Sequence, residues 1–318
     1  MSPFTGLSAF PITPANPTGR IDAPALAGLV GRLADARVGS VGLLGSTGTT
    51  PYFTRAERRR AIEAAATVLA GRIPLLAGVG ALRTDEAVAL AEDARAAGAD
   101  AGLLAPISYI PLRDDEVFEH YRAVAAAGLP LCIYENAATT GFTFSAALVA
   151  RLSRVPGIAA LKRAAPEAAE VPAALSALRA ACAPGFQVGY AVDARAAEAM
   201  LAGADAWYSV AAGLFPAPCA AIARAAQAGD AAEARRLNAA MQPLWDLFAR
   251  HTSIRVMYAA ARHLGLVATD PPRPILPLSA EATREVVEAI ALLPLPLGEG
   301  RGEAVLAAPP RTAIPASA

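Results

Sequence analysis

Hydrophobic residues in this chain gather in short runs, and each run is followed by a longer amphipathic stretch. The runs are apolar throughout rather than alternating, which is typical of parallel strands whose sheet is covered on both faces. We therefore interpret them as buried strands. They lie at residues 7–12, 38–44, 73–79, 99–105, 129–134, 158–162, 186–190 and 206–211.

The stretches between these runs have the composition and spacing of helices. One opens with Thr54 and Glu57, the spacing of a capping box. Regular strand–helix alternation predicts an α/β fold, a (β/α)₈ TIM barrel. A doubly wound open sheet is the alternative, but residues 78–83 do not complete the glycine-rich turn that it favours. The other predicted helices span 22–37, 84–97, 114–127, 145–154, 166–181, 193–201 and 216–228.

Beyond the eighth unit, the pattern predicts three additional helices packed on the barrel, at 231–248, 254–264 and 280–293. Residues 1–293 would thus form one catalytic domain, with a helical extension from about 230. Residues 294–318 are rich in Ala, Pro and Gly without periodicity, so we predict a disordered tail.

The overall composition removes several function classes. The 318 residues carry no net charge, so nothing favours nucleic acid or an anionic membrane as a partner. No apolar run approaches the length of about 20 residues that spans a bilayer, and a secretory leader is not apparent. The three cysteines are far apart, which predicts core thiols in a reducing cytoplasm. No histidine stands in a ligand pattern, so the sequence does not predict a zinc site.

Lys162 is the only lysine in the chain, since the other 27 of its 28 basic residues are arginines. It ends the apolar run at 158–162, an unusual place for a solvated charge. Lysine, unlike arginine, can lose its proton and attack a carbonyl as a free amine. We therefore predict that Lys162 forms a Schiff base with a carbonyl substrate. A strand-end lysine without function is the alternative.

Two other groups stand at predicted strand ends, and a barrel collects the carboxyl ends of its strands at one face. Tyr134 ends the fifth run, where a phenol can relay a proton. Ser46 and Thr47 lie between two glycines after the second run, where backbone N–H groups can bind an anion. Glu135 and Arg163 follow the key residues directly and are interpreted as structural.

Together these residues resemble the class I aldolases related to N-acetylneuraminate lyase and dihydrodipicolinate synthase. The resemblance covers about residues 5–293. Its order and spacing are specific, although no single motif is. It rests on residues 10–14, 45–48, 134, 141, 158–162 and 203–209.

The resemblance implies a homotetrameric barrel that binds pyruvate or another 2-oxo acid without a cofactor. Lys162 would be the Schiff-base nucleophile and Tyr134 the proton relay. Ser46, Thr47 and Gly48 would hold the substrate carboxylate, with the Thr47 hydroxyl linked to Tyr134.

The chain departs from the family pattern around the second substrate. Thr49 stands where the family usually has Glu. Thr139 lies in the segment where related synthases carry an arginine for the carboxylate of the aldehyde substrate. Tyr208 is bulkier than the usual aliphatic residue and would narrow the pocket. Tyr109 falls near the aromatic that a neighbouring subunit often lends.

These departures favour a Schiff-base lyase, either an aldolase or a dehydratase, that acts on a 2-keto-3-deoxy sugar acid or a hydroxy-2-oxo acid. The first alternative is 4-hydroxy-tetrahydrodipicolinate synthase. A non-catalytic barrel that binds 2-oxo acids is an alternative of another class. A phosphate-binding barrel enzyme would predict a glycine-rich turn after the last strands, where only Ala212-Gly213 stands.

Overall fold

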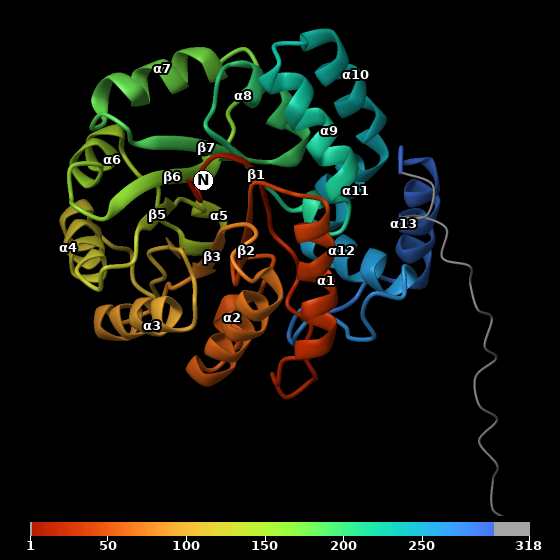
Figure 1. Ribbon diagram of the computed structural model, residues 1–318, viewed down its shortest axis with the longest axis horizontal. Coiled ribbons are helices and arrows are strands. Elements are labelled where there is room, and N and C mark those ends of the chain that lie inside the picture. The colour runs from red at the N-terminus through yellow and green to blue at the C-terminus, as the bar shows by residue number, and fades with distance from the viewer. Residues whose placement is uncertain (1, 296–318) are drawn as a thin grey trace, which may run out of the picture.

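The computed structural model describes residues 2–295 and shows eight parallel strands closed into a barrel, with helices around it (Figure 1). Each strand pairs with its neighbours in sequence, and β1 pairs with β8 to close the sheet. The TIM barrel prediction is thus confirmed. The strands are β1 Gly6–Ala9, β2 Ser40–Leu43, β3 Leu75–Gly78, β4 Ala101–Leu104, β5 Leu131–Tyr134, β6 Ile158–Ala164, β7 Gln187–Ala191 and β8 Ala206–Ser209.

Helices cover the outer face of the sheet, so each strand is buried on both sides as its apolar sequence predicts. The predicted tail from 294 lies outside the described residues except for 294 and 295. No helix within residues 2–295 is long and apolar enough to span a membrane. The barrel helices are α1 Ala23–Asp35, α2 Arg55–Leu69, α3 Thr84–Ala96, α4 Asp114–Ala125, α5 Ala137–Thr140, α6 Ala146–Leu152, α7 Val171–Ala181, α8 Ala196–Leu201 and α9 Pro216–Gln227, with short 3₁₀ turns η1 Thr50–Tyr52, η2 Asp193–Arg195 and η3 Ala211–Gly213.

Four further helices follow the eighth unit, at α10 Ala231–Ala240, α11 Gln242–His251, α12 Ser253–His263 and α13 Ala280–Leu292. They lie on one side of the barrel beyond α9 (blue-green to blue in Figure 1). The prediction of one helix over 231–248 is therefore wrong. Pro243 has no N–H to donate and suits only the first turn of a helix, so a new helix begins after Met241. For the same reason α7 begins at Val171, just before Pro172, and not at 166.

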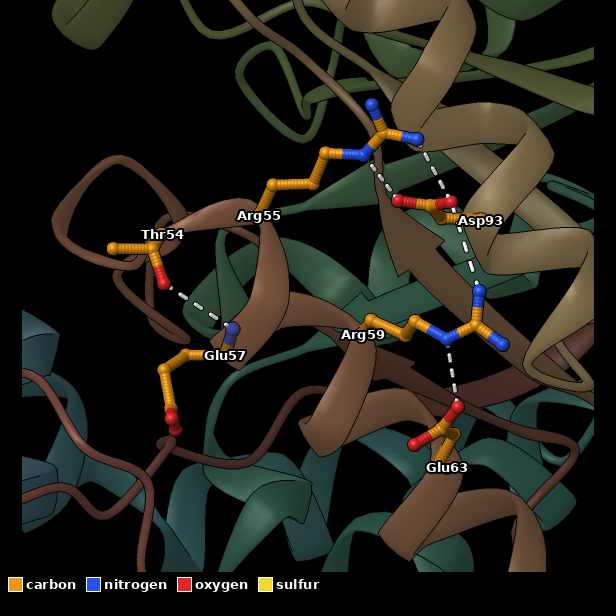
Figure 2. A network of polar contacts seen from close by, with 6 residues as sticks. All are labelled: Thr54, Arg55, Glu57, Arg59, Glu63 and Asp93. Atoms are coloured by element: carbon orange, nitrogen blue, oxygen red, sulfur yellow. Dashed lines mark hydrogen bonds and ion pairs between the residues drawn. The ribbon is translucent and has the colours of Figure 1, made fainter.

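The predicted capping box at the start of α2 is only half formed (Figure 2). The Thr54 hydroxyl accepts the backbone N–H of Glu57 at 3.3 Å. The Glu57 carboxylate instead accepts the N–H of Ile21 at 2.8 Å, which ties α2 to the loop before α1. Arg55 donates to Asp93 on α3, and Arg59 pairs with Glu63 at 2.8 Å. These contacts fix α2 against its neighbours.

Inside the barrel, large aromatic rings stand opposite glycines. A Cβ on Gly42 would lie 2.3 Å from the Phe10 ring, and one on Gly189 would lie 2.5 Å from the Tyr208 ring. Phe10 and Tyr208 meet edge to face, with centroids 6.0 Å apart. Substitution of either glycine would displace a ring. The barrel interior thus combines small residues and aromatics, and Lys162 lies among these rings.

Candidate active site

Lys162 points into the barrel and is 7% exposed. Its Nζ lies 3.9 Å from the centroid of the Tyr134 ring, with the Phe10 and Tyr208 rings at 5.2 and 5.9 Å. No carboxylate among residues 2–295 lies within 4.0 Å of this amine, whereas arginines form nearly every ion pair of the protein. A buried amine without a counter-ion is suited to react as a nucleophile.

Register explains why Lys162 and Tyr134 meet. The two residues are Cα partners in the pairing of β5 with β6, so both side chains project from neighbouring strands to the same interior. The common direction of the strands by itself predicts that these two strand ends lie at one face of the barrel. The structure thus brings the predicted nucleophile and the predicted proton relay into contact.

The Tyr134 hydroxyl has two hydrogen-bond partners. It lies 2.9 Å from the Ser46 hydroxyl, and the Asn136 side chain donates to it at 3.0 Å. Burial alone would raise the pKa of the phenol, but the nearby Lys162 charge and the hydrogen bonds from Ser46 and Asn136 together lower the pKa below its ordinary value. A phenol with a lowered pKa releases its proton more readily, as a relay requires.

The expected link from Thr47 to Tyr134 is wrong, because Ser46 makes this contact. Adjacent residues in a turn point in different directions, so a shift of one position changes which hydroxyl faces the barrel axis. Thr47 still lines the same cavity as Lys162. Asn136 was missed, although its place two residues after Tyr134 puts it on the same side of an extended segment.

The turn at 45–48 has the form of an anion site. Within the described chain, no hydrogen bond joins the backbone N–H groups of Ser46, Thr47 or Gly48 to another residue. A Cβ on Gly48 would lie 2.7 Å from the backbone nitrogen of Leu44, so only glycine fits there. Three free N–H groups beside a lysine are suited to hold a carboxylate.

Lys162 opens into a cavity of about 360 Å³, and Tyr208 forms part of its wall. The Tyr208 hydroxyl lies 3.6 Å from the sulfur of Cys132, and both side chains are fully buried. Burial raises the pKa of the Cys132 thiol to about 12, so this thiol stays protonated at neutral pH. The three cysteines are buried and free, as predicted.

Glu135 and Arg163 form an ion pair at 3.1 Å, which agrees with their structural interpretation. Burial raises the pKa of Glu135, and the Arg163 charge opposes that rise. Both also line the mouth of the Lys162 cavity.

The structure does not gather all predicted residues. Thr139 is exposed and lines a second cavity, described below. Tyr109 is 95% exposed and lines a separate small depression with Thr140 and Phe142. Tyr109 therefore does not reach Lys162 within one chain.

Comparisons with known proteins give the family of this chain. The profile of the Dihydrodipicolinate synthetase family matches residues 3–292. The chain belongs to this family. Its enzymes are class I Schiff-base lyases and aldolases, which agrees with the environment of Lys162.

Named relatives cover nearly all of the chain. A 4-hydroxy-tetrahydrodipicolinate synthase of Methylococcus capsulatus is 35% identical over 280 residues, covering 87% of this chain and 94% of the relative. A crystal structure of dihydrodipicolinate synthase from Agrobacterium tumefaciens is 56% identical, with a TM-score of 0.90 over 91% of this chain and 98% of that one. The synthase from Acinetobacter baumannii, solved with pyruvate, is 29% identical, with a TM-score of 0.84 over 91% and 98% of the two chains.

Proposed function

We propose that this family member forms a Schiff base between Lys162 and pyruvate or a pyruvate-derived 2-oxo acid. The observation that carries the proposal is the buried, unpaired Lys162 amine beside Tyr134. In this scheme, the Lys162 amine first transfers a proton to Tyr134 and then attacks the 2-oxo carbon, after which water leaves the carbinolamine. The resulting iminium accepts the electron pair when a bond to the neighbouring carbon breaks, which gives an enamine. The enamine returns this electron pair when a new bond to that carbon forms.

Tyr134 and Ser46 would move the protons of these steps. The carbinolamine oxygen must gain a proton to leave as water, and the Tyr134 hydroxyl is the nearest group with a lowered pKa. Ser46 can donate a proton to the phenolate or accept one from the phenol. The N–H groups of residues 46–48 would hold the carboxylate.

The test is to trap the adduct. The protein is incubated with pyruvate and borohydride, digested, and analysed by mass spectrometry for a reduced adduct on the Lys162 peptide. The Lys162→Arg variant is the matched control, because it keeps the charge and removes the nucleophile. An unmodified Lys162 peptide in the wild-type protein would refute the proposal.

For the overall reaction, the names of the relatives support 4-hydroxy-tetrahydrodipicolinate synthase over the sugar-acid lyase favoured by sequence analysis. The neutral Thr139 had argued against the synthase. Two assays separate the readings: pyruvate release from 2-keto-3-deoxy sugar acids, and pyruvate consumption with the aldehyde co-substrate of the synthase. Turnover in the first assay alone supports the lyase.

We further infer that the chain assembles as a homotetramer in which Tyr109 serves a neighbouring subunit. Tyr109 is 95% exposed and Ile110 is 70% exposed. Burial of such large side chains in a subunit interface would remove apolar surface from water, which supports the inference. Light scattering measures the mass of the assembly in solution, which should be four times that of one chain. A monomer with full activity would contradict the inference.

A further inference from the structure

A second cavity of about 560 Å³ adjoins that of Lys162. The two cavities share Ser46, Thr47 and Tyr134 as wall residues. A substrate held by Lys162 that extends past Tyr134 therefore enters the second cavity. Whatever lines that cavity contacts the part of the substrate distant from the 2-oxo group.

Among residues 2–295, Arg255 is the only Asp, Glu, Lys, Arg or His residue in the wall of this second cavity. Hydroxyl-bearing residues and apolar side chains form much of the rest. Two of the threonines, Thr49 and Thr50, are 1% and 8% exposed. The Thr50 hydroxyl oxygen is buried without a hydrogen-bond partner in the described structure. Such a cavity has a positive potential and unused hydrogen-bonding groups, which suits an anion.

The surroundings of Arg255 leave its guanidinium free for a ligand. Its Nη1 donates to the Thr252 hydroxyl at 2.8 Å. Within residues 2–295, no carboxylate lies within 4.0 Å of it, unlike most arginines of the structure. The hydrogen bond to Thr252 holds the side chain in place while other N–H groups remain available.

The position of Arg255 is also unfavourable for a purely structural cation. It lies in the first turn of α12, where the helix dipole repels positive charge. The preceding Thr252 has a φ of 65°, a rare conformation for a β-branched residue. A bound anion at this helix end would offset the repulsion between Arg255 and the helix dipole.

We propose that Arg255 is a specificity-determining residue that binds a carboxylate at the far end of the substrate. The substrate class is a 2-oxo acid with a second carboxylate, or the adduct of pyruvate with an aldehyde that carries one. The inference rests on the proposed function for the position of the 2-oxo end. It assigns to α12 the charge that Thr139 lacks in the same cavity.

The experiment compares ligands that differ only at the far end. Binding of 2-oxoadipate and of 2-oxohexanoate, which has a methyl group in place of the second carboxylate, is measured by calorimetry. We expect 2-oxoadipate to bind the wild-type protein about 10- to 100-fold more tightly, the range of a hydrogen bond to a charged group. Arg255→Gln should abolish this ratio, and Arg255→Lys should restore part of it.

Arg262→Gln is the matched control, because Arg262 lies on the same helix but pairs with Asp270 and is absent from the cavity wall. It should leave the ratio unchanged. Equal binding of the two acids by the wild-type protein, or a ratio that survives Arg255→Gln, would overturn the inference.

Trapping of pyruvate by borohydride separates this inference from the proposed function. Arg255→Gln should still form the pyruvate adduct on Lys162, because pyruvate has no far end to recognise. Loss of adduct in the wild-type protein removes the Schiff-base mechanism. If both proteins form the adduct and Arg255→Gln leaves the affinity ratio of 2-oxoadipate to 2-oxohexanoate unchanged, the role of Arg255 is refuted and the Schiff-base mechanism is not.

Discussion

Arg58 on α2 joins two loops that form the second cavity, and its replacement should lower the stability of the fold. The side chain is 8% exposed. Its Nε donates to the carbonyl of Phe53 at 3.2 Å and its Nη1 to the carbonyl of Gly80 at 3.0 Å. Within the described chain, no carboxylate lies within 4.0 Å of it. Burial accordingly lowers the pKa of its guanidinium.

The expected change in the free energy of unfolding follows from these contacts. Two hydrogen bonds from a charged donor contribute about 1.5–3 kcal/mol each. Arg58→Met keeps much of the side-chain length but removes both bonds. It also removes a buried cation, and relief of that desolvation offsets part of the loss. We expect the free energy of unfolding to fall by about 2–4 kcal/mol.

Equilibrium urea denaturation measures the change. Arg60→Met is the matched control, because Arg60 lies on the same helix and forms only a long ion pair with Glu57, at 3.8 Å. Its effect should stay within about 0.5 kcal/mol. Equal effects of the two substitutions would refute the reasoning, because Arg58 would then contribute no more than a surface charge.

Three other predictions concern the active site and pH. Tyr134→Phe should reduce kcat by about 10²–10⁴-fold, the range of general acid–base catalysis, whereas binding of pyruvate persists; steady-state kinetics with calorimetry checks both. Ser46→Ala should reduce kcat about tenfold more than Thr47→Val, because of these two residues Ser46 is the one that contacts the Tyr134 hydroxyl; the reverse order would contradict this assignment. Burial lowers the pKa of His120, so the folded state favours the neutral ring and its stability falls as pH decreases below the unfolded value of about 6.5. Between pH 8 and 5, the wild-type protein should lose more stability than His120→Gln, by at most about 1.4 kcal/mol per pH unit. Urea denaturation at several pH values checks this, and the same pH dependence of the free energy of unfolding in both proteins would contradict the prediction.

The succession of strands and the buried strand-end position of Lys162 could be predicted from the sequence because both depend on local properties. Apolar runs specify buried strands wherever they fold, and strand direction places the carboxyl ends of β5 and β6 at one face. Lys162 and Tyr134 therefore had to lie close together. The three buried, free cysteines likewise agree with the prediction made from their wide separation in the sequence.

Other features depend on side-chain direction, which sequence patterns do not give. The choice of Ser46 over Thr47 as the partner of Tyr134 is set by the path of one turn. The fit of the Tyr208 ring over Gly189 is set by the register of β7 against β8. Neither contact has a signal in spacing.

The sequence by itself determined the fold and the strand end, on one face of the barrel, at which the lone lysine lies. Only the tertiary structure placed Arg255 in the cavity beside it. Arg255 is one of many arginines in a helix far along the chain, and nothing local distinguishes it. Packing of the C-terminal helices brings the start of α12 to the cavity at the strand ends. Within residues 2–295 no carboxylate pairs with Arg255 there, and we therefore propose that its charge recognises the substrate.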